Sequence, residues 1–326
     1  ARYQYYSGLL KYKRTFAEVH NIDAMFGISA EKWVNKKVVT AREKFEDAGI
    51  YDLNLATGTQ GNGGGKTHNG TYSYIARLNY NYAEKYMVEL MGRRDGNSKF
   101  APGYRFKSFG SVSLGWAFSE EQFVEFLKPV LSFGKLRLSY GSSGNDVGLG
   151  DYDYVSTVSL GTAGFGTIPA NQVSSGFGGL ISYDRTWEKV SQKNFGIDLN
   201  FFDNRLKATF DYFIKDNTGM LVNVTYPGVL GGKAPKTNSG HLNVKGWEFT
   251  IGWRDQIKDF SYYANFNIGD TKSLLKEMEG ADSYGAGWNA AVNGYPLNSY
   301  FLYRTDGYFK DQAEVCLLYT SPSPRD

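Results

Sequence analysis

Polar and apolar residues alternate with a period of two along most of the chain. In 72–82, Tyr, Ala and Leu side chains occupy every second position, and Ser, Arg and Asn fill most positions between them. The same alternation runs through 194–201, 206–215, 247–254 and 260–268. A period of two is typical of β-strands with one apolar face. The stretches are about 9–13 residues long, which exceeds the usual strand of about 5–6 residues and suits a tilted strand that crosses a bilayer.

The connections between the predicted strands alternate in length. Outer-membrane barrels have short periplasmic turns and long extracellular loops, whereas a soluble β-sandwich has no reason to keep every second loop long. The alternation therefore predicts an all-β, antiparallel transmembrane β-barrel. The predicted strands are 7–16, 21–34, 71–82, 86–95, 105–118, 131–142, 191–202, 205–216, 246–254, 260–271 and 299–309; the short links are 17–20, 83–85, 119–130, 203–204 and 255–259; the mostly long links are 35–70, 96–104, 143–190, 217–245 and 272–298.

The two faces of the predicted strand at 206–214 differ in polarity. One face is wholly apolar or aromatic, and the other carries Lys207, Asp211 and Lys215. If the apolar face meets lipid, the charged face lines a wet lumen. That orientation avoids the cost of about 2–4 kcal/mol for a Lys or Arg on the lipid face at the bilayer midplane. Tyrosines near strand ends suit an aromatic girdle at the membrane interface; they are Tyr82, Tyr86 and Tyr262.

Composition agrees with a β-rich membrane protein. The 326 residues include 25 Tyr, 22 Phe and 39 Gly but only 8 Pro, too many aromatics for a disordered segment. The net charge is +3, and no basic block is long enough to indicate nucleic-acid binding. No apolar run approaches the roughly 18 residues that a membrane helix needs. The chain begins with Ala1 and has no signal peptide, which indicates a mature form or a fragment.

The last eleven residues differ abruptly from the rest. They read CLLYTSPSPRD, contain the single cysteine, Cys316, and resemble a translated sequencing adapter. The alternative is a natural Ser/Pro-rich tail. We expect 1–315 to be part of a barrel domain and 316–326 to be a non-native tail, so that the true C-terminus, and the start as well, would lie outside this chain.

Two segments have local helical signals. Ser119 precedes Glu120, Glu121 and Gln122 and predicts an N-capped helical turn that packs under the barrel rim. The segment 38–45 predicts a short helix inside a loop.

Motifs that suggest catalysis or metal binding are incomplete. The Gly61–Thr67 segment ends like a P-loop, but Gln60 replaces the first glycine and a strand follows, so we expect a flexible loop tip. The segment 94–98 lacks the first acidic ligand and closing Glu of a calcium loop, so we expect a surface turn. Three aspartates in a Gly-rich loop could hold a divalent cation: Asp146, Asp151 and Asp153. The histidines lack ligand spacing and are His20, His68 and His241.

We therefore expect no catalytic residue, no metal and no cofactor, and the chain is predicted not to be an enzyme. Two tryptophans in long loops, Trp187 and Trp288, are candidates for stacking on sugar rings. The alternative is that they anchor loops or belong to the aromatic girdle.

Several short blocks follow one another in a specific order along the chain. They are Tyr86–Met87 with Arg93–Phe100, Phe109–Trp116 with Ser119–Glu121, Leu136–Gly141 with Gly144–Asn145, Trp187–Lys189 with Asn194–Asp198, Phe202–Leu206, Asp211–Phe213, Asn238–Gly240, Lys245–Glu248, Gly294–Pro296 and Asp306–Phe309. Together they make the chain resemble the SusC/RagA branch of TonB-dependent transporters, over about 6–315.

The resemblance implies a barrel of about 22 strands with a plugged lumen in the bacterial outer membrane. It implies import of oligosaccharides or peptides, with a SusD-like lipoprotein as an extracellular lid and a TonB complex pulling on a plug. No plug, TonB-contact segment or N-terminal carboxypeptidase-regulatory-like domain is found in the sequence. The eleven predicted strands are about half of a family barrel, so a partial barrel with open edges is expected. The alternatives are a soluble or surface carbohydrate-binding module and a passive porin.

Overall fold

Ten strands form one antiparallel sheet in which every strand pairs with its sequence neighbours within the sheet. The computed structural model describes 1–45, 49, 52–165, 170–177, 179–223, 229, 234–279, 291–302 and 307–313. A separate two-stranded hairpin inserts between the sixth and seventh strands of the sheet. The large sheet contains β1 (Arg2–Phe16), β2 (His20–Arg42), β3 (Gln60–Tyr82), β4 (Tyr86–Asn97), β5 (Phe106–Trp116), β6 (Leu131–Asn145), β9 (Glu188–Phe201), β10 (Leu206–Asn223), β11 (Lys236–Ile257) and β12 (Phe260–Glu277), and the hairpin contains β7 (Val158–Phe165) and β8 (Ala170–Phe177).

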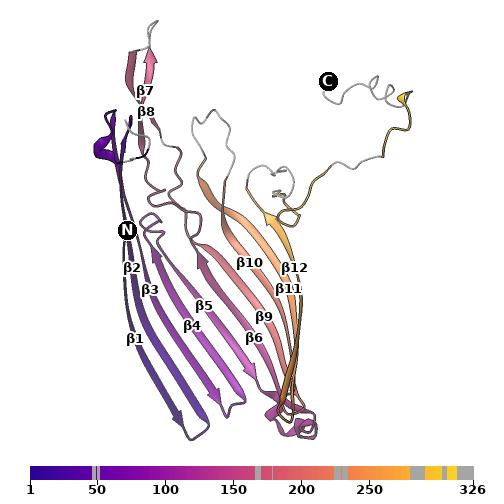
Figure 1. Cartoon of the computed structure of the whole chain (residues 1–326). Coiled ribbons are helices and arrows are strands. Elements are labelled where there is room, and N and C mark those ends of the chain that lie inside the picture. Colours follow the sequence, from indigo (N-terminus) through magenta and orange to yellow (C-terminus); the bar gives the residue numbers. More distant parts are fainter. Residues whose placement is uncertain are drawn as a thin grey trace.

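The sheet curves into an open wall whose short turns lie at one rim and whose long connections lie at the other (Figure 1). This arrangement confirms the predicted alternation of short and long links and the partial antiparallel barrel. Ten of the eleven predicted strands are present, most of them longer than predicted. Because the sheet is a wall rather than a closed barrel, β1 and β12 are its two edges.

The prediction of an eleventh strand at 299–309 is wrong for 299–302 and 307–309, which form no strand; 303–306 lie outside the described residues. The preceding segment instead turns back on β12, where Gly294 N–H donates to Leu275 O at 2.8 Å and Leu275 N–H donates to Tyr295 O at 2.9 Å. Asn298 and Gly307 have positive φ, which breaks an extended ladder. The β7–β8 hairpin was missed because its Gly- and Ser-containing sequence carries no clear alternation.

The predicted helix at 38–45 is also wrong, because β2 continues to Arg42. Val38, Val39 and Thr40 are β-branched and favour a strand. They pair with the glycine run of β3, so Gly61–Thr67 belongs to a strand and is not the loop tip that we expected. The β2–β3 hairpin therefore extends far beyond its neighbours.

The helical turn predicted at Ser119 is present as two 3-10 helices, η2 (Phe118–Glu120) and η3 (Gln122–Leu127). Ser119 is not the cap: Ala117 and Glu121 occupy the N-cap positions, and Ser119 is buried inside η2. The Phe118 ring packs directly on Gly134 of β6, which holds the turn against the rim. Any side chain at position 134 would clash with this ring.

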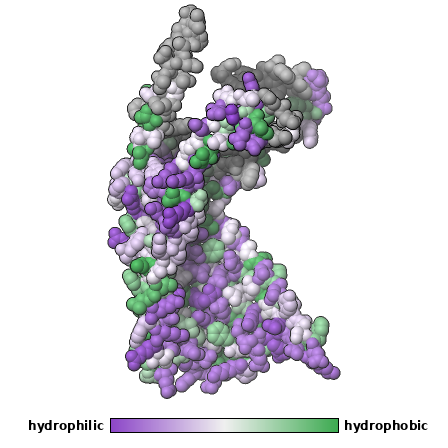
Figure 2. All heavy atoms as spheres, turned by 60° about the vertical axis from the view of Figure 1, so that its left-hand side comes forward, coloured by the Kyte–Doolittle hydropathy of each residue, from purple (hydrophilic) through white to green (hydrophobic). Residues whose placement is uncertain are grey.

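The two faces of the wall separate apolar from polar side chains. In register, Phe210 of β10 lies beside Phe249 of β11 and Ile197 of β9, whereas the next position places Asp211 beside Glu248. Large apolar side chains remain exposed on the outer face, which is the arrangement expected of a surface that meets lipid. Figure 2 shows hydrophilic side chains gathered in the hollow of the lower wall, with hydrophobic patches at its left margin.

The predicted aromatic girdle has a matching position at the short-turn rim. Tyr82 ends β3 and Tyr86 begins β4, and their rings stack with centroids 6.3 Å apart. Tyr262 lies two residues after β12 begins, at the same rim. No helix in the described part of the chain is long and apolar enough to cross a bilayer.

Candidate functional site: the inner face of the wall

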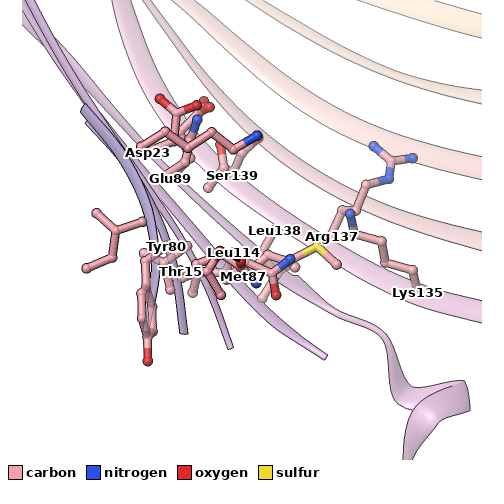
Figure 3. A pocket seen from close by; sticks show the side chains of 18 of the residues that line it. Thr15, Asp23, Tyr80, Met87, Glu89, Leu114, Lys135, Arg137, Leu138 and Ser139 are labelled. Atoms are coloured by element: carbon pink, nitrogen blue, oxygen red, sulfur yellow. Dashed lines mark hydrogen bonds between the residues drawn. The ribbon is translucent and has the colours of Figure 1, made fainter. Parts of the chain in front are cut away.

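A groove of about 530 Å³ occupies the lower half of the inner face (Figure 3). It is lined by side chains from β1 to β6 and β9, among them Asp23, Glu89 and Ser139. The inward position of Asp23 and Glu89 follows from the register, since Asp23 pairs with Asn79 and Asn79 pairs with Glu89. Tyr80, the next residue of β3, projects to the opposite side of the wall. The strand period thus produces a polar groove on one side and an aromatic surface on the other.

An ion-pair network centred on Arg137 braces one side of this groove. The Arg137 guanidinium donates from Nε and Nη2 to the two carboxylate oxygens of Asp198 at 2.7 and 3.0 Å, and from Nη2 to Asp211 at 3.0 Å. Asn194 donates to the second oxygen of Asp211 at 3.0 Å. Two-point Arg–carboxylate geometry fixes orientation as well as charge. The network therefore ties β6, β9 and β10 together on the lumen side.

Gly196 leaves the space that this network occupies. It lies opposite both Arg137 and Asp211 in the register. A Cβ at this position would stand 2.6 Å from an Asp211 oxygen and 2.7 Å from the Arg137 guanidinium carbon. A side chain at position 196 would therefore push Arg137 away from Asp211, and the ion-pair network requires glycine here.

A second cavity of about 510 Å³ lies higher on the same face, nearer the long loops. Its lining is rich in hydroxyl groups, and it also includes an ion pair in which Nε of the exposed Arg93 lies 2.6 Å from the buried Asp95. Arg93 reaches Ser73 at 3.4 Å as well. Hydroxyls, one ion pair and an aromatic edge can bind a polar, hydrogen-bonding ligand. The hydroxyl residues are Ser29, Thr71, Ser73, Ser111, Ser142 and Ser143.

Trp187 closes the loop end of this upper cavity as part of a small core. Its ring is 7% exposed and packs against Phe100 and Phe109, with centroids 5.2 and 6.1 Å away. Its indole Nε1 donates to Arg105 O at 2.8 Å, and Lys107 Nζ donates to its carbonyl at 2.8 Å. The ring therefore anchors loops, and stacking on a sugar would require this core to open. Trp288 lies outside the described residues.

Sequence reasoning placed 94–98 on the surface, and the structure corrects this. Asp95 and Asn97 are buried at the end of β4. Asn97 donates to Asp146, which also lies 3.8 Å from Lys99. The segment is therefore part of the joint between β4 and the β6–β9 loop.

The three loop aspartates do not converge. Asp146 accepts from Asn97, Asp151 accepts from Asn69 at 3.0 Å, and Asp153 accepts from Gly150 N–H and pairs with Arg185. Among the described residues, no group of three or more His, Cys, Asp or Glu side chains could hold a metal ion. The histidines are equally dispersed: His20 contacts Tyr80, His68 contacts Tyr152 and His241 contacts Asp216.

Sequence reasoning missed the residues that organise the inner face. Arg137, Asp198 and Asp211 could have been found by asking which opposite charges share the inward face of neighbouring strands. Asn238 had no such signal: its side-chain amide accepts from Thr186 N–H at 2.8 Å and donates to Thr186 O at 2.8 Å and Gly219 O at 2.7 Å. That role depends on the loop before β9 meeting the upper ends of β10 and β11, which no local pattern records.

A curved antiparallel wall with a polar inner face, an apolar outer face and turns of alternating length is a section of an outer-membrane β-barrel. The family model described as "TonB dependent receptor-like, beta-barrel" matches residues 2–314. The chain belongs to this family. Its members lie in the outer membrane and act as receptors and transporters, not as enzymes.

Curated relatives are similar along most of the chain. TonB-dependent receptor P39 of Formosa agariphila is 28% identical over 316 residues, which cover 92% of this chain and 28% of the relative. TonB-dependent receptor SusC of Bacteroides thetaiotaomicron is 28% identical over 256 residues, covering 73% of this chain and 25% of the relative. The chain thus spans about a quarter of the length of these relatives.

A solved structure has the same fold. The RagAB peptide importer in its "closed-closed" state superposes with a TM-score of 0.80 at 22% sequence identity, over 90% of this chain and 33% of that chain. The likeness supports the barrel wall seen here.

Proposed function

We propose that this chain is a section of the barrel wall of a TonB-dependent outer-membrane importer that takes up oligosaccharides or peptides together with a SusD-like lipoprotein. The family match carries this proposal, since it covers nearly the whole chain. The similarity to SusC and to the RagAB peptide importer supports the SusC/RagA branch within the family. A plug and a TonB complex would supply the energised step.

The inner face is the part of this wall that substrate would meet. We place the substrate-facing surface at the upper cavity, because it lies next to the long loops and presents hydroxyl groups beside the Arg93–Asp95 pair. Such a surface suits a ligand with many hydrogen-bonding groups. A sugar chain and a peptide backbone both meet that description, so the chemistry supports either class.

Uptake measurements on the full-length receptor test the proposal. Cells that carry the gene should take up one defined oligosaccharide or peptide pool, and uptake should stop when TonB is deleted. Removing the neighbouring lipoprotein should reduce uptake as well. Uptake that persists without TonB would contradict the proposal and favour the passive porin, and a receptor that stays monomeric in water without detergent would favour the soluble binding module.

A further inference from the structure

Three lysines stand in one row across the outer face of β9–β12. Lys193 of β9 and Lys245 of β11 lie opposite Ile214 of β10, one on each side. Lys272 of β12 lies opposite Lys245. All three lysines are exposed. They share the strand face of the apolar outer residues, and not that of the lumen charges.

The row lies directly beyond the aromatic part of the outer face. Two positions nearer the short-turn rim, the same face carries Phe195, Tyr212 and Trp247 in register. Tyr and Trp mark the level of the lipid head groups. A lysine costs about 2–4 kcal/mol at the bilayer midplane and about 0–1 kcal/mol near the interface. The row therefore belongs at the extracellular head-group level, since the long loops lie on that side.

These lysines have no acidic partner within the described part of the wall. Asp216, one outward position beyond Ile214 on β10, already pairs with His241 at 3.0 Å and Lys276 at 3.6 Å. Asp270 lies one outward position below Lys272 and forms no ion pair with it. Directly opposed like charges such as Lys245 and Lys272 destabilise an antiparallel pair. An external anion between them would remove that repulsion.

Other strands carry the same charge on this side. Arg94 of β4 lies opposite the outward Tyr74 and holds its guanidinium 5.5 Å from the Phe106 ring centroid. Lys32 of β2 lies on the outward face as well, opposite Gly70. The outer surface beyond the apolar band is thus basic at several points around the wall.

We propose that the Lys193–Lys245–Lys272 row binds phosphate groups of lipids in the extracellular leaflet. Lysine binds phosphate as a point charge, and clustered lysines at a membrane surface attract anionic head groups, with about 1 kcal/mol for each lysine. The lipid is the one partner that this face must meet, because the row continues the lipid-facing surface. The inference rests on membrane position and does not depend on import.

The test uses the full-length receptor that carries this wall, purified in detergent and offered diphosphoryl lipid A. Bound lipid A is counted by native mass spectrometry. The variant K193S/K245S/K272S should bind it about 10- to 100-fold more weakly. Lipid A stripped of both phosphates should bind the unchanged receptor as weakly as diphosphoryl lipid A binds this variant.

Two further variants separate charge from folding. K193R/K245R/K272R keeps the charge and should retain binding even if the serine variant folds poorly. K13S/K207S/K215S removes three lysines from the inner face and should bind lipid A as the unchanged receptor does. Equal binding by the outer serine variant and the unchanged receptor, or equal loss in the inner control, would overturn the proposal, and so would strong binding of dephosphorylated lipid A.

Discussion

The membrane-crossing wall and the layer of loops above it are held together by different interactions. The wall rests on continuous backbone ladders between neighbouring strands, and its side chains add a few inward ion pairs. The loop layer rests on individual side chains. Trp187 donates to the backbone of another loop, and Asn238 of β11 joins the Thr186 loop to Gly219 of β10. The comparison teaches that single substitutions should change the loop layer sharply, whereas the wall should tolerate most of them.

Replacing Trp187 by alanine should give the largest effect. The substitution removes the central ring of the core formed with Phe100, Phe109 and Leu149, and large-to-small changes of this kind cost about 3–5 kcal/mol. Hydrogen exchange of the full-length receptor in detergent should show faster exchange in 98–105 and 186–188. Trp33→Ala, which removes an exposed ring from β2, is the matched control and should leave these segments unchanged. If hydrogen exchange became equally faster in the halves of β9 and β10 near the short turns, the wall and the loop layer would not be stabilised independently.

Gly196→Val should be the most damaging change inside the wall. The new side chain would force Arg137 away from Asp211, and overpacking of this kind costs about 1–3 kcal/mol. Denaturant unfolding of the refolded receptor in lipid vesicles measures the loss. Gly92→Val on β4 has open space around its Cβ and should be close to neutral. Similar losses in both variants would mean that β-strand glycines matter here for a reason other than the ion network.

Asn238→Ala should have an intermediate effect that is confined to the loop end of the wall, where β10 and β11 meet the loop before β9. It removes three part-buried hydrogen bonds that join the Thr186 loop to Gly219 of β10, and an ordinary hydrogen bond contributes about 0.5–1.5 kcal/mol, less where water replaces the lost partner. Limited proteolysis near 179–187 should become faster, while the detergent-resistant barrel stays intact. Unchanged proteolysis would show that water replaces the amide fully.

Glu121→Gln should have the smallest effect, a small loss of stability near neutral pH that disappears in acid. Hydrogen bonds from Tyr86, 2.6 Å away, and Trp116, 3.3 Å away, lower the pKa of Glu121 below its usual 4.5. Because the folded-state pKa is lowered, the stabilisation is present above the unfolded value of 4.5 and is lost as pH falls through the folded value. The melting temperature of the original receptor should therefore fall below pH 4.5 by more than that of the variant. Parallel curves for the two proteins would contradict this role.

How much the sequence predicts differs between the same two regions. The wall follows from a period of two that is visible in each strand, so ten strands and their two faces could be predicted without tertiary information. The loop layer could not, because contacts such as Asn97 with Asp146 join residues 49 positions apart. The prediction of a helix at 38–45 was wrong for a related reason. Pairing with β3 extends β2 through this segment, and that partner is not visible in the local sequence.

The unequal lengths of the strands decide what can be reached from outside the cell. β2 and β3 each contain 23 residues, whereas β4 contains 12. At about 3.3 Å per residue, the hairpin is about 75 Å long, well beyond the roughly 40–45 Å of a bilayer with its head groups. Its glycine run includes Gly63 and Gly65, whose Cβ positions face open space. An epitope inserted there should stand clear of the lipid layer and be accessible to an antibody on intact cells.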